Sequence, residues 1–291
     1  MTISEPSSFA FKTADLSNFH CSLPMVAPRN SHTPFLRPLA GALQGLTSGP
    51  ALVMLSGMSR LSWHIDCHVH TSCYSPCSRL LPELACQRAL AHGLDGLVLT
   101  EHQVQWPLAD LAVLRRNYPE LALYSGLEIT LAEGFDAVCL IPEVDMELPY
   151  GLSIRELSQH ISPFGEEAFC FLAHPFRFLE QWDSDLDRLV PFVHGVEMNS
   201  VNILRGQACW DQNRLAPCKQ ALYDRLATHG LLPLFNSDAH LAEAVGTIAT
   251  RVGLNTNEVP RDTAELAQFF RTAPQTSEWQ HKERLLPLVA R

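Results

Sequence analysis

The chain has 291 residues, which is long enough for one large domain or two modest ones. Hydrophobic residues make up 46% of it and charged residues 18%, as in globular proteins with a sizeable core. The formal net charge is -10 and no run of lysine or arginine occurs, which argues against long nucleic acid and membranes as partners. A small anionic ligand stays compatible with this charge if bound cations supply positive charge locally.

Residues 1–60 are rich in proline and serine and have no helical or strand period. The uncharged stretch from Pro38 to Ser59 contains several glycines, so it is too weakly apolar for a good membrane span. We expect a flexible extension over 1–60, a folded domain over 61–275 and a C-terminal tail over 276–291. The nine cysteines form no CxxC pair, which favours reduced thiols and a cytoplasmic location.

From residue 61 onward, short apolar runs alternate with amphipathic segments, which is typical of βα units around a mainly parallel sheet. Pro82 and Glu83 in a first turn and Gly93 as a stop predict a helix within 79–93. The predicted strands that follow are 94–102, 121–130, 136–142, 167–175 and 231–240. The helices predicted among these strands are 106–117, 153–161 and 212–229. A further apolar run over 247–254 and the segment 263–273 end the alternation.

Polar residues gather at or just past the C-terminal ends of these strands. They are His68 and His70, Glu101 and His102, Glu128, His174, Asn199, and Asp238 and His240. In a barrel of parallel strands these ends converge on one face, and that face carries the chemistry. Residues that are far apart along the chain are therefore expected to meet in one pocket.

The stretch "WHIDCHVHTSC" (63–73) contains the first of these pairs. Alternate side chains of an extended segment share a face, so His68 and His70 can bind one ion, and Asp238 and His240 repeat the spacing. Imidazole and carboxylate groups are usual ligands of zinc, manganese and iron. A lone HxH is a weak signal, since a solvated or capping pair explains it as well. The ordered set HxH, TEH, GLE, HP and SDxH is a strong one.

Residues 61–275 resemble the PHP family, named for DNA polymerases and histidinol phosphatases. The motifs that carry the resemblance are "DCHVHT", "TEH", "GLE", "AHP", "VEMNS" and "SDAH". The stretch 70–102 is especially similar to stand-alone bacterial members. The resemblance implies an α/β fold, a distorted (β/α)7 barrel with two to three divalent metal ions, and a metal-dependent phosphoesterase activity.

The resemblance also implies the metal ligands. It places His68, His70, Glu128 and Asp238 around a first ion, Glu128 and His174 at a second, and His102 and His240 at a third. Two positions depart from the family pattern. Asp136 is the nearest candidate where many members have a further histidine for the second ion, and Cys77 follows where an aspartate or histidine is usual for the third. Cys77 is either a thiolate ligand or a structural cysteine.

A metal-activated hydroxide would attack phosphorus in line, with the charge neutralised by paired ions. Asp238, His240 and Glu128 are the expected catalytic residues, with His240 or Asp238 assisting proton transfer. Glu101 is expected to orient ligands rather than to act as a base. The candidate substrate-binding residues are Arg177, Asn199, Arg79 and Arg205, although Arg79 and Arg205 are slightly better explained as surface arginines.

Two other functions remain open. An amidohydrolase-like metallohydrolase acting on C–N bonds would use a metal-bridging lysine, but Lys12, Lys219 and Lys282 all lie away from strand ends. A non-catalytic PHP scaffold would lose ligands that this chain keeps. The expected substrate is a small phosphomonoester or phosphodiester of the nucleotide or sugar/amino-alcohol phosphate class. The sequence indicates neither which one it is nor the oligomeric state.

Overall fold

The computed structural model describes residues 62–289 except 178, 180, 206–216 and 255–258. The extension predicted over 1–60 lies outside these residues. Among the helices described, none is both long enough and apolar enough to cross a membrane.

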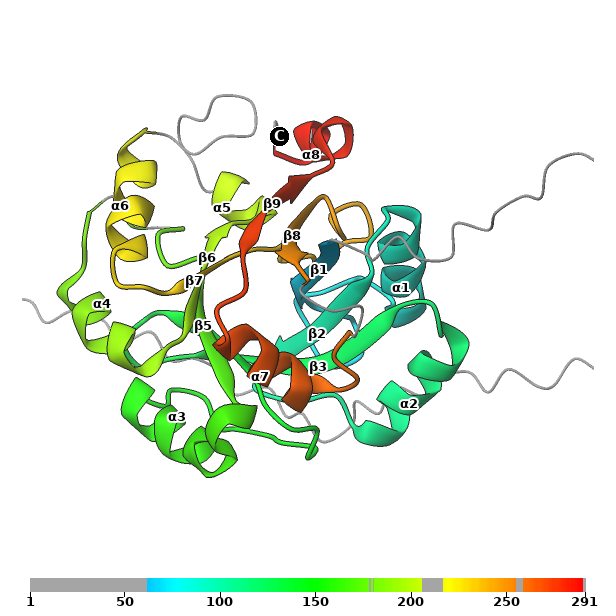
Figure 1. Cartoon of the computed structure of the whole chain (residues 1–291), viewed down its shortest axis with the longest axis horizontal. Helices are drawn as coiled ribbons and strands as arrows, with labels where there is room; N and C mark the ends of the chain where they lie inside the picture. The colour runs from blue at the N-terminus through cyan, green and yellow to red at the C-terminus, as the bar shows by residue number, and fades with distance from the viewer. Residues whose placement is uncertain (1–61, 178, 180, 206–216, 255–258, 290–291) are drawn as a thin grey trace, which may run out of the picture. The chain divides into compact units, whose positions relative to one another are not determined.

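A single curved sheet of nine strands organises the described part of the chain (Figure 1). Its order is β7-β6-β5-β4-β3-β2-β1-β8-β9. The strands are β1 (Ser62–Val69), β2 (Gly96–His102), β3 (Ala122–Thr130), β4 (Asp136–Leu140), β5 (Phe169–Ala173), β6 (Gly195–Asn199), β7 (Leu232–Phe235), β8 (Ile248–Gly253) and β9 (Thr276–Gln280).

Strands β1–β2–β3 and β5–β6–β7 form two parallel sets, and β4 runs antiparallel between them. The sheet nearly closes on itself, because Ala239 after β7 bridges to Val69 of β1. The Thr250 hydroxyl of β8 also donates to the Phe235 carbonyl of β7 (2.8 Å). Strands β1–β7 therefore form the expected distorted seven-stranded α/β barrel, and the prediction of the fold class is confirmed.

Most helices lie around the outside of the sheet, and α7 lies across one end of the barrel (Figure 1). Their bounds are α1 (Pro82–Ala91), α2 (Leu108–Asn117), α3 (Ile154–Ile161), α4 (Ser184–Leu189), α5 (Val201–Arg205), α6 (Pro217–Ala227), α7 (Thr263–Arg271) and α8 (Lys282–Val289). Outward side chains such as Ile129 and Leu172 pack with Leu157 of α3, Leu186 of α4 and Tyr223 of α6 in one buried cluster. Burying these apolar side chains provides the main driving force for the α-on-β packing.

The interior of the barrel is filled by a second apolar cluster, which α7 covers at the end where the parallel strands begin. Trp63 at the start of β1 contacts Phe269 edge-on, and Phe169 at the start of β5 contacts Phe270. Aromatic side chains therefore close the end where the strands begin. The polar residues follow the C-terminal ends of the strands, so they lie at the opposite end of the barrel.

Two features differ from the sequence expectations. The segment 276–291, expected to be a tail, contributes β9, which pairs with β8, and α8. β9 is short, and its residues, mostly polar, are exposed or only partly buried, so it lacks the apolar pattern that predicts a strand. Of the helix predicted over 212–229, the structure shows α6 from Pro217 to Ala227, and residues 212–216 lie outside the described part.

Candidate metal centre

The C-terminal end of β1 directs His68 and His70 to the same side, as the HxH spacing predicts. Both side chains are fully buried, and their Nε2 atoms lie 3.0 Å apart. The pairing register of β1 with β2 shifts between Asp66 and Val69, next to the histidines. The Asp66 carboxylate accepts the backbone N–H groups of Ser237 (2.9 Å) and Gly246 (3.1 Å). Asp66 thus joins the end of β1 to the segment after β7 and supports the pair.

Glu128 at the end of β3 is the centre of the cluster, because four imidazoles contact its buried carboxylate. Its Oε1 lies 3.3 Å from His68 Nε2 and 3.2 Å from His174 Nε2. Its Oε2 lies 3.2 Å from His70 Nε2 and 3.0 Å from His102 Nδ1. One carboxylate therefore faces ligands from β1, β2 and the segment after β5, which is the arrangement of a bridging group.

Two aspartates complete the inner cluster. Asp238 Oδ1 lies 3.6 Å from the Nε2 atoms of both His68 and His70, and its Oδ2 lies 3.6 Å from His174 Nε2. Asp136 Oδ2 lies 3.8 Å from His174 Nδ1. Asp136 is the first residue of β4, and it reaches this rim because β4 runs antiparallel to β3.

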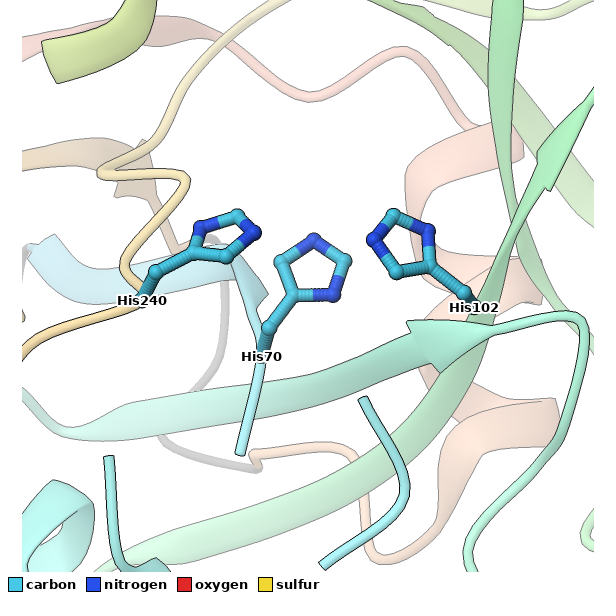
Figure 2. Close-up of side chains that lie close together, drawn as sticks. All are labelled: His70, His102 and His240. Atoms are coloured by element: carbon cyan, nitrogen blue, oxygen red, sulfur yellow. The ribbon is translucent and has the colours of Figure 1, made fainter. Parts of the chain in front are cut away.

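A third set of nitrogens lies beside this cluster. The rings of His70, His102 and His240 are turned toward one another in Figure 2, and one nitrogen of each lies within 4.8 Å of the others. Within the part of the chain that the structure describes, four groups have ligand atoms this close. They are His70, His102 and His240; His68, His174 and Glu197; His68, His70 and Asp238; and Glu128, Asp136 and His174.

The donor set fits divalent cations. Glu128 is 2% exposed, yet its Oε1 has no hydrogen bond of good geometry within the described residues, although two imidazoles face it. A buried carboxylate oxygen without a hydrogen bond is costly unless a cation binds it. Imidazoles and carboxylates in this number are typical ligands of zinc, manganese or iron. Residues at two of these positions, His174 and Asp238, have left-handed backbone angles (φ 30° and 49°), a strain common at functional sites.

The electrostatics of the cluster follow from burial and from the packed charges. Burial by itself lowers the pKa of His68, but the carboxylates of Asp238, Glu128 and Glu197 outweigh it and hold this pKa well above its usual value. The same balance raises the pKa of His174 to about 9. Burial would raise the pKa of Glu128, but the charge of His68 and the other imidazoles close to the carboxylate hold this pKa well below its usual value. The centre therefore keeps anionic carboxylates available to cations.

The histidines of the third group, and the cysteine beside them, differ in how their pKa values are shifted. Burial lowers the pKa of His70 to about 4, so its imidazole is neutral and able to act as a ligand. Burial also disfavours the charged form of His102, but hydrogen bonds with Cys77 and Glu128 raise its pKa to about 11. Burial raises the pKa of the Cys77 thiol, yet hydrogen bonds with His102 and His240 outweigh it and bring this pKa to about 7.

Glu197 of β6 is a functional residue that the sequence reasoning missed. It is fully buried and lies 3.1 Å from His68 Nδ1. It also accepts the backbone N–H of His174 and the Asn236 amide, each at 3.0 Å. Its place at a strand end, inside the motif "VEMNS", was the available signal. Glu197 therefore holds two predicted ligands in position from behind.

Glu101 lies behind the ligands, as expected. Its carboxylate accepts the backbone N–H of Thr71 (3.1 and 3.0 Å), the residue after His70. It also accepts the indole N–H of Trp106 (2.7 Å), which is itself buried. These bonds fix the turn that follows His70. His64, by contrast, pairs with Asp95 (3.9 Å) and takes no part in the cluster.

A cavity of about 450 Å³ opens above the cluster. Arg177 and Arg205 line it, and the Arg205 Nε donates to the Leu288 carbonyl (2.9 Å). The other two predicted substrate residues do not line it. Asn199 donates to Glu278 of β9 (2.6 Å), and Arg79 is exposed on the loop after β1, its backbone N–H bound to the His240 carbonyl.

Comparisons with known proteins bear on the fold. No protein-family model matches the chain, and no curated protein matches it. Among solved structures it is similar to PsfC from Pseudomonas syringae PB-5123, with a TM-score of 0.56 and 19% identity, covering 79% of this chain and 96% of PsfC.

It is also similar to a two-domain protein from Bacteroides vulgatus ATCC 8482 described as containing a predicted PHP-like metal-dependent phosphoesterase. That match has a TM-score of 0.53 and 18% identity and covers 79% of this chain and 69% of the other. Likeness at these identities establishes the architecture. The chain has the PHP-type barrel fold that its strand-end motifs predict.

Proposed function

We propose that the chain is a metal-dependent phosphoesterase that hydrolyses a small phosphomonoester or phosphodiester. The observation that carries the proposal is the Glu128 carboxylate with four imidazoles around it, His68, His70, His102 and His174, each within 3.3 Å. A single bridging carboxylate is suited to hold two cations a few ångströms apart, the spacing that clamps a phosphoryl group. A solitary structural metal would need only four donors and no shared one.

The ligands are assigned by their positions. His68, His70, Glu128 and Asp238 would hold one ion, and Glu128, His174 and Asp136 a second. Divalent ions there would supply Lewis acidity and a water-derived nucleophile near neutral pH.

His240 and Asp238 lie at the open side of the cluster, where the leaving oxygen would emerge. The His240 side chain is 28% exposed and its Nδ1 lies 3.5 Å from Asp238 Oδ1. The same nitrogen lies 3.1 Å from the Asp238 backbone carbonyl, which holds the ring in place. A partly exposed imidazole held in this way can pass a proton between the site and solvent. Asn202 donates to Asp238 Oδ2 (2.6 Å) and fixes that carboxylate.

The substrate is inferred from the cavity. Arg177 and Arg205 line it together with the cluster, and guanidinium groups suit the nonbridging oxygens of a phosphoryl group. A volume of about 450 Å³ suits a small molecule. A phosphate ester of the nucleotide or sugar/amino-alcohol class agrees with both features.

The alternative of C–N bond hydrolysis is less well supported. Of the described lysines, Lys219 is buried on α6, and its Nζ donates to the carbonyls of Phe176 (2.9 Å) and Leu179. Lys282 begins α8, and Lys12 lies outside the described residues. Neither described lysine lies in the ligand groups, in which Glu128 would be the residue that holds both ions. A non-catalytic scaffold has no reason to keep seven converging ligands.

The test is phosphate release from a panel of phosphomonoesters and phosphodiesters with added Mn²⁺ or Zn²⁺. We expect turnover of at least one ester by the wild type and a loss of at least about 1000-fold in His68→Ala and Asp238→Ala, since both remove ligands. His160→Ala on exposed α3 is the matched control and should keep wild-type rates. Wild-type turnover in either ligand variant, or amide hydrolysis without ester hydrolysis, would refute the proposal.

A further inference from the structure

The loop after β1 is fastened to the backbone of two predicted ligands. The Ser78 hydroxyl donates to the His70 carbonyl (2.8 Å) and lies 3.2 Å from the His240 carbonyl. Within the loop, the N–H of Ser75 binds the Thr71 carbonyl (3.0 Å), and the N–H of Ser78 binds the Ser75 carbonyl (2.9 Å). Residue 77, between these anchors, therefore has a set position over the two histidines.

Cys77 presents a free thiol to the cavity at this position. The same cavity is lined by the His102 and His240 side chains, so the Cys77 thiol and these two imidazoles face one space. The third histidine of the set, His70, contributes a nitrogen within 4.8 Å of nitrogens of these two (Figure 2). One sulfur and three imidazoles thus come from four separate places in the chain.

The neighbours of Cys77 do not offer an alternative donor. Ser75 is fully buried, and its hydroxyl accepts the His102 backbone N–H (3.2 Å) while lying 3.3 Å from His70 Nδ1. Pro76 has no donor atom. The Tyr74 hydroxyl donates to Asp110 (2.6 Å), on α2. Of residues 74–77, Cys77 is therefore the one whose side chain faces the cavity that His102 and His240 line.

We propose that Cys77 is a thiolate ligand, with His102 and His240, of a divalent ion at a third position of the centre, beside the ion that His70 would hold. This rests on the proposed metallohydrolase function and specifies its third metal position. As the sulfur–metal bond forms, the thiol loses its proton to solvent. A sulfur and imidazole set is the chemistry of zinc-type ions, whereas manganese and magnesium prefer oxygen. The third position therefore selects a softer ion than the carboxylate-rich pair.

Cobalt(II) is the probe, because thiolate coordination adds a charge-transfer band in the near ultraviolet that nitrogen and oxygen ligands do not give. Metal-free full-length protein is titrated with Co²⁺, and bound metal is measured by mass spectrometry. The wild type should develop the band. Cys77→Ser should lack it and bind one equivalent at least about 10-fold more weakly. Cys77→Asp, with an oxygen ligand, should restore that equivalent without the band and reduce the preference for zinc over manganese.

Cys86→Ala is the matched control, since Cys86 is a free, buried cysteine of α1 and does not line the cavity. It should keep the band. Cobalt binding by the wild type without the band, or an unchanged band in Cys77→Ser, would overturn the thiolate ligand and leave the phosphoesterase proposal standing. Absence of any cobalt binding would overturn both.

Discussion

At the scale of single residues, buried carboxylates contact both ring nitrogens of the central histidine, His68. Glu128 faces the Nε2 atoms of His68, His70 and His174. Glu197 lies at the opposite nitrogen of His68, at 3.1 Å from Nδ1. With a cation bound, an Nδ1–H donated to Glu197 would leave the Nε2 lone pair for the ion that Glu128 and Asp238 also hold. This is the usual carboxylate–histidine–metal arrangement, in which the outer carboxylate sets the tautomer.

The substitution Glu197→Gln tests this positioning role. It keeps the shape but removes the charge that orients His68, so we expect metal affinity to fall by about 10- to 100-fold. Excess metal should then restore much of kcat, which a merely misfolded variant would not show. Affinity is measured by competition with a chromophoric chelator. Glu156→Gln, on exposed α3, is the control, and equal affinities in the two variants would contradict the role of Glu197.

At the scale of elements, the rim that carries the ligands and the end that closes the barrel are separate. α7 covers the closed end, where Arg271 contacts His194 Nε2 at 2.5 Å and the Cys170 N–H donates to His194 Nδ1 (3.0 Å). Burial, and after it the charge of Arg271, lowers the pKa of His194 to about 4. His194 is thus neutral in the folded protein at neutral pH and lies away from the metal centre.

This pKa gives a prediction for stability. Because the folded pKa lies below the unfolded value of about 6.5, the unfolded chain binds the extra proton first as the pH falls. The contribution of neutral His194 to the free energy of unfolding is fully present above pH ~6.5 and is lost as the pH falls toward 4. We expect His194→Gln to flatten the pH dependence of the unfolding free energy in this window by roughly 1 kcal/mol, reduced for partial exposure. Urea denaturation at several pH values measures it.

His160→Gln is the control for that series, since His160 is exposed on α3. It should reproduce the wild-type slope. An identical slope in His194→Gln and the wild type would show that His194 is not held neutral by the fold.

The elements that the sequence reveals are those with a strong apolar period. The buried runs of β2 and β5 and the segments of α1 and α3 all lie within the predicted ranges. The direction of β4 was not predictable, because five buried-strand residues read the same in either direction. β9 was not predicted, because its sequence is mostly polar and its pairing with β8 depends on tertiary contacts.

At the scale of the whole molecule, the barrel brings together side chains from residue 68 to residue 240. Every metal ligand predicted from strand-end motifs lies in or beside one cluster, including Asp136, which arrives on an antiparallel strand. The positions of Asn199 and Arg79 were less predictable, because side-chain direction near a strand end depends on local register. The register of β6 shifts between Glu197 and Asn199. Glu197 then faces the centre, and Asn199 bonds to Glu278 of β9.

The metal content of the purified full-length chain tests the central claim most directly. After incubation with Zn²⁺ or Mn²⁺ and removal of free metal, mass spectrometry should find at least about two divalent ions per wild-type chain, as a bridged centre requires. Asp238→Asn should bind fewer, because Asp238 contacts four of the histidines. A wild-type chain that retains no stoichiometric metal, or an Asp238→Asn variant that retains the full amount, would contradict the account.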